Sequence, residues 1–141
     1  MLEYDSSVFI VMALYQVNVT CLGMKISLLK SKLHPAVVTD ANVEYEGSMT
    51  ISKDLMDKAG LFAYEKILCG NLYNGNRFET YVIPGEAGRG EIILNGGTAH
   101  LGQAGDRVTI MAFAEVDAAD AVNWKPTIVI CGEGNVVERI K

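Results

Sequence analysis

Short strand-like runs, separated by turns rich in Gly, Asn and Asp, make up most of the chain from Lys25 onward. The runs at 66–73 and 77–83 flank Asn74-Gly75-Asn76, and Asn-Gly is a strong hairpin signal because both residues tolerate positive φ. Further strand-like runs follow at 91–94, 107–114 and 127–131. Many short strands joined by tight turns are typical of a small all-β barrel or sandwich, which is the fold class predicted here.

Residues 37–45 and the segment after them give two further local predictions. The odd-numbered residues from Val37 to Tyr45 alternate with the even-numbered ones in the period of two that predicts a half-buried strand. Ser52 is placed to cap a short helix that runs to Ala59, and Gly60 is placed to end it. Residues 117–124 predict one or two helical turns. We therefore expect only short helices among the strands.

Length and charge restrict the classes of function. A chain of 141 residues, half of them apolar, has the length of one domain. It is large enough to fold around a hydrophobic core without a disulfide or a structural metal. Its formal net charge is −5, and it has no run rich in Lys and Arg. Neutralisation of phosphates supplies most nucleic-acid affinity, so a nucleic-acid partner is not expected.

The three cysteines, Cys21, Cys69 and Cys131, are widely spaced and odd in number. Such a set indicates small buried apolar side chains in a reducing compartment rather than a disulfide framework. Adding His34 and His100 gives no zinc-ligand spacing, so no metal is expected. We expect a cytoplasmic protein.

Residues 1–23 are considered apart from the rest. The apolar run from Val8 to Tyr15 is shorter than the roughly 20 residues that cross a bilayer. No Lys or Arg precedes Lys25, so the basic start of a secretory signal is missing and no membrane is implied. The stretch is either an extra strand packed on the domain or an extension, non-native or disordered, upstream of a start at Met24. We favour the extension, with residues 24–141 as the domain.

Two segments carry residues suited to chemistry. Gly47-Ser48 follows the alternating run, and Gly allows the sharp backbone geometry that a hydroxyl needs to reach the preceding carbonyl. A β-turn Ser bonded to its own backbone is the simpler interpretation. Residues 77–81 offer the Arg77 guanidinium, suited to a carboxylate, and the Tyr81 phenol, suited to proton donation. Taken alone, this run equally fits an exposed strand.

Two more segments complete the set. Asn95-Gly96-Gly97-Thr98 follows a strand, and adjacent glycines let backbone N–H groups approach an anion or a carbonyl, although a plain tight turn also fits. Lys32 and His34, two residues apart on a strand, project to the same face and could hold a carboxylate. Ordinary exposed and packed side chains explain that pair equally well.

Together and in this order, these segments resemble the aspartate 1-decarboxylase family. The resemblance extends from about Met24 to the region of Val129, with compatible spacing throughout. The matching stretches are Lys32-Leu33-His34, residues 39–48, residues 74–81, residues 95–99 and Trp124-Lys125-Pro126. Each stretch is a weak motif, but together, in the order and spacing of one family, they make a strong combination. The resemblance implies a six-stranded double-ψ β-barrel and a homotetramer with active sites between subunits.

The resemblance also implies self-processing and a reaction. The Ser48 hydroxyl would attack the Gly47 carbonyl, and cleavage would divide the domain into residues 24–47 and 48–141, with Ser48 converted into a covalent pyruvoyl group. That group would form a Schiff base with L-aspartate and act as the electron sink for its decarboxylation to β-alanine, which feeds pantothenate biosynthesis. A maturation helper protein is a further partner that the resemblance allows.

Residue roles follow from the same resemblance. Tyr81 would be the proton donor, while Thr80 would bind substrate and stabilise the oxyanion during cleavage of Gly47–Ser48. The remaining residues are substrate contacts (Lys32, Arg77 and the backbone of Gly96, Gly97 and Thr98) and supporting residues (His34, Tyr45 and Asn95). The alternative function is a β-barrel binding or assembly module without enzymatic activity, in which Gly47–Ser48 stays intact.

Overall fold

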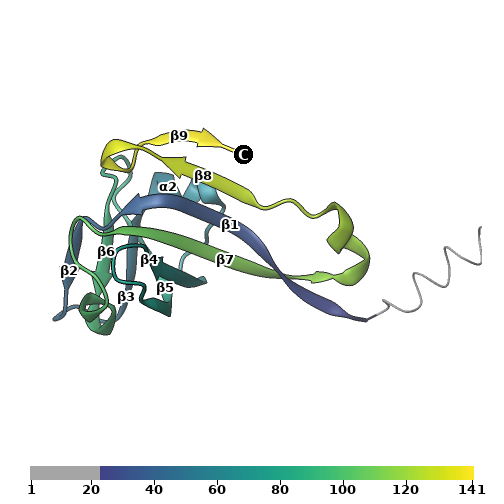
Figure 1. Cartoon of the computed structure of the whole chain (residues 1–141), viewed down its shortest axis with the longest axis horizontal. Helices are drawn as coiled ribbons and strands as arrows, with labels where there is room; N and C mark the ends of the chain where they lie inside the picture. The colour runs from purple at the N-terminus through teal and green to yellow at the C-terminus, as the bar shows by residue number, and fades with distance from the viewer. Residues whose placement is uncertain (1–22) are drawn as a thin grey trace, which may run out of the picture. The chain divides into compact units, whose positions relative to one another are not determined.

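The computed structural model describes residues 23–141 (Figure 1). The expected extension at residues 1–23 thus lies outside the described residues except for Gly23. The described residues form two compact units: a larger one, Leu29–Phe113 with Lys125–Lys141, and a smaller one made of residues 23–28 with Ala114–Trp124. The candidate site residues all belong to the larger unit.

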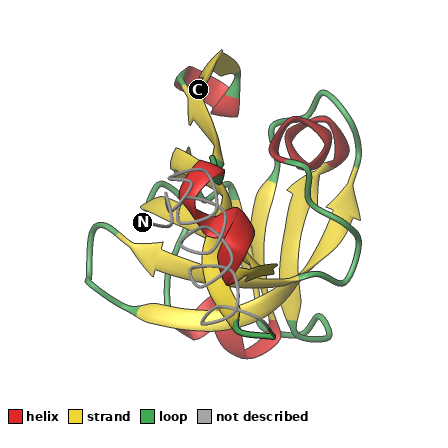
Figure 2. Ribbon diagram, turned by 90° about the vertical axis from the view of Figure 1, so that its right-hand side faces the viewer, coloured by secondary structure: helices red, strands yellow, loops and turns green. Residues whose placement is uncertain are grey.

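Strands dominate the described residues, and the helices among them are short (Figure 2). The nine strands within residues 23–141 are β1 (Lys25–Val37), β2 (Asp40–Asn42), β3 (Ser48–Ser52), β4 (Lys66–Asn71), β5 (Arg77–Gly85), β6 (Ile92–Asn95), β7 (Arg107–Asp117), β8 (Thr127–Cys131) and β9 (Val137–Ile140). One α-helix, α2 (Lys53–Ala59), and three 3₁₀ helices, η1 (Gly96–His100), η2 (Ala118–Asn123) and η3 (Glu133–Asn135), complete the described elements. The predicted all-β barrel class is confirmed.

The strand order is β2-β6-β3-β5-β4-β7-β1-β8-β9, so chain neighbours are often not sheet neighbours. Parallel pairs (β1 with β8, β2 with β6, β3 with β5) occur among antiparallel ones. Strand β6 lies between β2 and β3, and β3 in turn lies between β6 and β5. This order brings Ser48, at the start of β3, beside segments that follow it by more than thirty residues.

The predicted hairpin is confirmed. Strands β4 and β5 pair antiparallel, from Lys66 opposite Tyr81 to Gly70 opposite Arg77. Gly75 has a φ of 78°, and the Asn71 N–H donates to the Asn76 carbonyl over 2.8 Å, which closes the connection. The predicted strands at 91–94, 107–114 and 127–131 correspond to β6, β7 and β8.

The predicted alternating strand over 37–45 is wrong at residues 38–39 and beyond Asn42, because β1 ends at Val37 and β2 covers only Asp40–Asn42. Strand β2 ends there because Asn42 Oδ1 accepts a hydrogen bond from the Glu44 N–H over 3.0 Å, which turns the backbone away from the sheet. Val43 and Tyr45, expected on a half-buried face, are 49% and 51% exposed. The residues before Ser48 therefore form an exposed loop, not a strand end.

The helix prediction is correct in its limits and wrong in its capping bond. Helix α2 begins after Ser52 and ends at Gly60, which has the left-handed φ of 66°. The Ser52 hydroxyl makes no cap bond, because it accepts the Glu91 N–H over 2.7 Å instead. A contact with the residue before β6 thus replaces the local cap.

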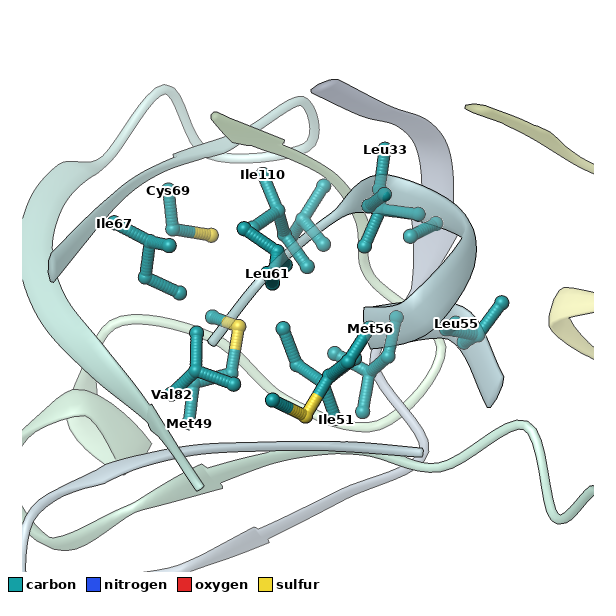
Figure 3. Packing of buried hydrophobic residues seen from close by; sticks show 14 of the residues in the cluster. Leu33, Met49, Ile51, Leu55, Met56, Leu61, Ile67, Cys69, Val82 and Ile110 are labelled. Carbon is teal, nitrogen blue, oxygen red and sulfur yellow. The ribbon is translucent and has the colours of Figure 1, made fainter. Parts of the chain in front are cut away.

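The core lies on one face of the sheet in the larger unit. Met49 of β3 pairs with Val82 of β5, and both side chains are fully buried beside Ile51 (Figure 3). Leu55 and Met56 of α2 join the same cluster. Cys69 and Cys131 are free and buried, as expected, whereas Cys21 lies outside the described residues. No helix among residues 23–141 is long and apolar enough to cross a membrane.

The smaller unit has its own polar contacts. Lys25 Nζ lies 2.7 Å from Asp117 Oδ1, and the Ala118 N–H donates to the Met24 carbonyl over 2.9 Å. Helix η2 follows, which confirms the predicted helical turns after Asp117.

Candidate active site

Ser48 is buried at the first position of β3, with 1% of its surface exposed. Its backbone pairs with Asn95 of β6, and the Asn95 amide donates to Ser48 Oγ over 3.1 Å. The same amide nitrogen donates to Thr50 Oγ1 over 2.9 Å. Ser48, Thr50 and Asn95 therefore form a side-chain cluster on the face of β3 opposite to the core residues Met49 and Ile51.

The main-chain carbonyl of Ser48 also has a donor close by. Thr98 Oγ1 lies 3.3 Å from the Ser48 carbonyl oxygen and 2.8 Å from the Asn95 carbonyl oxygen. Thr98 belongs to η1, which begins directly after Asn95 with the buried residue Gly96 at a φ of 59°. Polar groups of β6 and η1 thus contact both oxygens of Ser48, Asn95 the hydroxyl and Thr98 the carbonyl.

Alternation along β5 divides its candidate residues between two faces. Arg77 and Tyr81 are exposed, whereas Thr80 is partly buried on the other face, with Val82. Because Met49 pairs with Val82 and both face the core, Ser48 and Tyr81, one residue earlier on each strand, share the opposite face. The register of β3 and β5 thus brings Tyr81 to the face that carries Ser48.

The exposed face of β5 has defined partners. An ideal Cβ on Gly70 would lie 3.4 Å from Arg77 Nη1, so the guanidinium lies over the bare backbone of Gly70 on β4. Glu79 Oε2 pairs with Lys66 Nζ over 3.0 Å. The Tyr81 ring lies 6.5 Å from the Tyr64 ring, centre to centre. Tyr81 remains 40% exposed beside these contacts.

Lys32 and His34 lie on β1, both partly buried. Burial lowers the pKa of His34 from its ordinary value, and the neighbouring positive charges of Lys32 and Arg107 lower it further. His34 Nδ1 lies 2.6 Å from Thr109 Oγ1, a hydrogen bond that the neutral imidazole can make.

Within residues 23–141 of one chain, the predicted site residues fall into separate groups. Hydrogen bonds join Ser48 to Asn95 and Thr98, while none joins Ser48 to Lys32 or Arg77. Tyr45 lies in the exposed loop before Gly47. The described residues contain no group of three or more His, Cys, Asp or Glu side chains that could hold a metal ion.

The sequence prediction missed three residues at these sites: Thr50, Thr109 and Gly70. Thr50 lies two residues after Ser48 on the same strand face, a spacing that could have indicated it. Thr109 bonds to His34 and Gly70 lies against Arg77, each on a different strand from its partner. Only the strand order reveals these contacts.

Known proteins of one family are similar to this chain in sequence. A model of the family described as Aspartate decarboxylase matches residues 24–138. A protein named Aspartate 1-decarboxylase from Alcanivorax borkumensis is 51% identical over 115 residues, which cover 82% of this chain and 91% of the relative. Proteins of the same name from Chlorobaculum parvum (50% over 116 residues, 82% and 91%) and Myxococcus xanthus (47% over 114 residues, 81% and 88%) are similar to it as well.

Proposed function

This chain belongs to the aspartate decarboxylase family, and on that premise we propose that it makes a covalent pyruvoyl group by self-cleavage between Gly47 and Ser48. Its reaction is the decarboxylation of L-aspartate to β-alanine and CO₂, a step that supplies pantothenate biosynthesis. Family membership favours this enzyme over an unprocessed binding or assembly module. The contact of Asn95 with the buried Ser48 hydroxyl is the observation that carries the processing step.

Cleavage uses groups of the chain itself. The Ser48 hydroxyl oxygen attacks the Gly47 carbonyl carbon, and the peptide C–N bond breaks to leave an ester. Elimination releases Gly47 as a carboxylate, and the dehydroalanine that remains takes up water and loses ammonia to give the keto group. The N–H of Asn95 occupies one lone pair of Ser48 Oγ, which orients the hydroxyl for this attack.

The surroundings of Ser48 fit a carbonyl-bearing group built on this residue. Asn95 and Thr98 place an amide and a hydroxyl donor beside it, and its burial excludes bulk water. When formed, the pyruvoyl group supplies an electron sink for the electrons released as CO₂ leaves. The backbone of Gly96, Gly97 and Thr98 forms the wall of the substrate pocket.

Three charged or acidic groups would act on aspartate. Arg77 presents a planar pair of donors suited to a carboxylate, and Lys32 adds a second positive charge. Tyr81 would donate the proton that replaces the departing carboxylate. The position of Tyr81 on the face that carries Ser48 supports this role.

A homotetramer with active sites between subunits completes the proposal. Lys32 and His34 lie on β1, four strands away from β3 in the sheet order, so a neighbouring copy is the simplest source of these groups. Thr80, which faces away from Tyr81 in its own strand, would meet Gly47 as a donor through a neighbouring copy or a twist of the strand end. Phe62 and Tyr64 are 73% and 75% exposed, and a subunit contact would cover them.

Two further parts of the proposal concern the cell. The buried free thiols of Cys69 and Cys131 agree with a reducing compartment, so we place the enzyme in the cytoplasm. A helper protein would act on the exposed loop before Ser48 if maturation needs one.

Replacement of the processing nucleophile tests the proposal. Ser48→Ala removes the hydroxyl, so neither the ester nor the pyruvoyl group can form. The variant should stay a single chain and release no CO₂ from aspartate. Ser52→Ala, a buried serine outside the cluster, is the matched control and should be cleaved. Release of CO₂ by Ser48→Ala would refute the assignment of the cofactor.

A further inference from the structure

The loop of residues 43–47 is attached at both ends to the same residue of β6. Asn42, the last residue of β2, pairs with Asn95 from one side, and Ser48, the first residue of β3, pairs with Asn95 from the other. The loop therefore crosses over the end of β6, where Gly96 begins the next element. The bond between Gly47 and Ser48 lies at the far end of this crossing.

Gly96 leaves no room for a side chain beneath the loop. An ideal Cβ on Gly96 would lie 2.7 Å from Gly47 Cα, 2.8 Å from the Gly47 nitrogen and 3.0 Å from the Tyr45 carbonyl oxygen. All three are backbone atoms, so no side-chain rotation can relieve the contact. Gly47 itself has nothing within 4 Å of an ideal Cβ. The steric requirement thus falls on Gly96 and not on the residue that is cut.

We propose that Gly96 is a positioning residue for self-cleavage, which seats the Gly47 carbonyl within reach of the Ser48 hydroxyl. The inference rests on the proposed function, since it presumes that this bond is cut. Ser48 is fixed by its pairing with Asn95 and by the Asn95 amide, so its hydroxyl is in place whether or not the loop is seated. The position of the carbonyl depends on the Gly47 backbone, which lies directly on Gly96. A methyl group at position 96 would displace the Gly47 backbone while the Ser48 hydroxyl stays in place, so the carbonyl and the hydroxyl would move apart.

Three alanine variants separate the contact from other effects. Gly96→Ala should fold and slow cleavage by about 10²-fold, the cost of a displacement of about 1 Å in a reacting pair. Gly105→Ala adds a methyl group at another positive φ (93°), where an ideal Cβ meets nothing within 4 Å and no site residue is involved, and should be cut at the wild-type rate. Gly60→Ala has nearly the same φ (66° against 59°) and open space for its Cβ, so it matches the backbone cost of Gly96→Ala without the contact.

Cleavage is followed by intact mass on freshly refolded protein, with size exclusion and near-ultraviolet circular dichroism to verify the fold. Wild-type protein that is never cut would refute the proposed function itself. Folded Gly96→Ala that is cut as fast as wild type would overturn this inference alone, as would an equal slowing in Gly60→Ala.

A second variant covers the case in which Gly96→Ala does not fold. Insertion of one glycine between Val43 and Glu44 lengthens the loop at small cost and leaves Gly96, Gly47 and Ser48 unchanged. One added residue removes the requirement that the Gly47 backbone lie directly on Gly96, so cleavage should slow here too. Cleavage of this folded variant at the wild-type rate would show that seating on Gly96 is not required.

Discussion

The Asn95 side chain donates a hydrogen bond to Ser48 Oγ over 3.1 Å, and the two residues are also paired through their backbones across β3 and β6. The backbone pairing fixes the distance between the two residues, and the amide then fixes the direction of the hydroxyl. Because the Ser48 hydroxyl is already held in position, little conformational entropy is lost when it reaches the geometry of attack.

This relationship predicts the behaviour of Asn95→Ala. Loss of one hydrogen bond of about 1 kcal/mol should slow cleavage at Gly47–Ser48 roughly fivefold. Thr50→Val, which removes the second acceptor of the same amide, should be cut at nearly the wild-type rate. The rates are read from the ratio of cut to uncut chain over time. Equal rates in Asn95→Ala and wild type would remove Asn95 from the processing account.

Tyr81→Phe should separate processing from turnover. Phenylalanine keeps the ring that lies beside Tyr64 and removes only the proton that the phenol can give. Cleavage should continue, while aspartate turnover should fall by roughly 10²–10⁴-fold, as is typical for a lost general acid. Thr80→Val should show the reverse, with slow cleavage from loss of an oxyanion donor. A Tyr81→Phe protein that is uncut, or cut and fully active, would transfer the proton-donor role to another group.

Glu79→Ser should leave substrate binding nearly unchanged. Although Glu79 lies on the same strand face as Arg77, its carboxylate pairs with Lys66 over 3.0 Å, and both side chains are exposed. Exposed pairs contribute little, so KM for aspartate should change by less than about threefold. Arg77→Ala, the reference variant, should raise KM by roughly 10- to 100-fold through loss of a charged hydrogen bond. A large fall in KM for Glu79→Ser would mean that the carboxylate competes for Arg77.

His34 predicts a dependence of stability on pH. Folding lowers the pKa of His34 below its ordinary 6.5, so the unfolded chain binds a proton more readily. Above pH 6.5, His34 is neutral in both states and does not reduce the free energy of unfolding. As the pH falls from 6.5 toward the lower pKa of the folded state, protonation favours the unfolded chain and the free energy of unfolding decreases. His34→Gln cannot titrate, so its melting temperature should fall less between about pH 7.5 and 5.5. An equal fall of the melting temperature with pH in His34→Gln and in the wild type would contradict this.

Local turn chemistry explains which parts of the fold can be predicted from the sequence. Gly60 and Gly75 adopt positive φ, one at the end of a helix and the other in a hairpin turn. Both features are predictable from the sequence because glycine favours these backbone conformations wherever it occurs. The predicted strand over 37–45 is divided at residues 38–39 between β1 and β2, and it ends at Asn42. Periodicity carries no information about the long-range backbone bonds of Val38 and Thr39 or about the hydrogen bond by which Asn42 turns the chain.

The candidate site is predictable as a set of residues but not as an arrangement. Ser48 and Asn95 are 47 positions apart and meet only because β6 inserts between β2 and β3. The contact of Gly96 with Gly47 depends on the same strand order, which no local pattern encodes. The resemblance to a family supplies the residue roles, and the strand register supplies their faces.

The mass of the purified protein tests the central claim most directly. Self-cleavage predicts two chains, one that ends at Gly47 and one of residues 48–141 that is lighter by one ammonia than a chain beginning with Ser48. The larger chain should also resist Edman degradation, because a keto group replaces its amine. A single uncut mass after prolonged warm incubation, with or without a cell extract to supply a helper, would contradict the account.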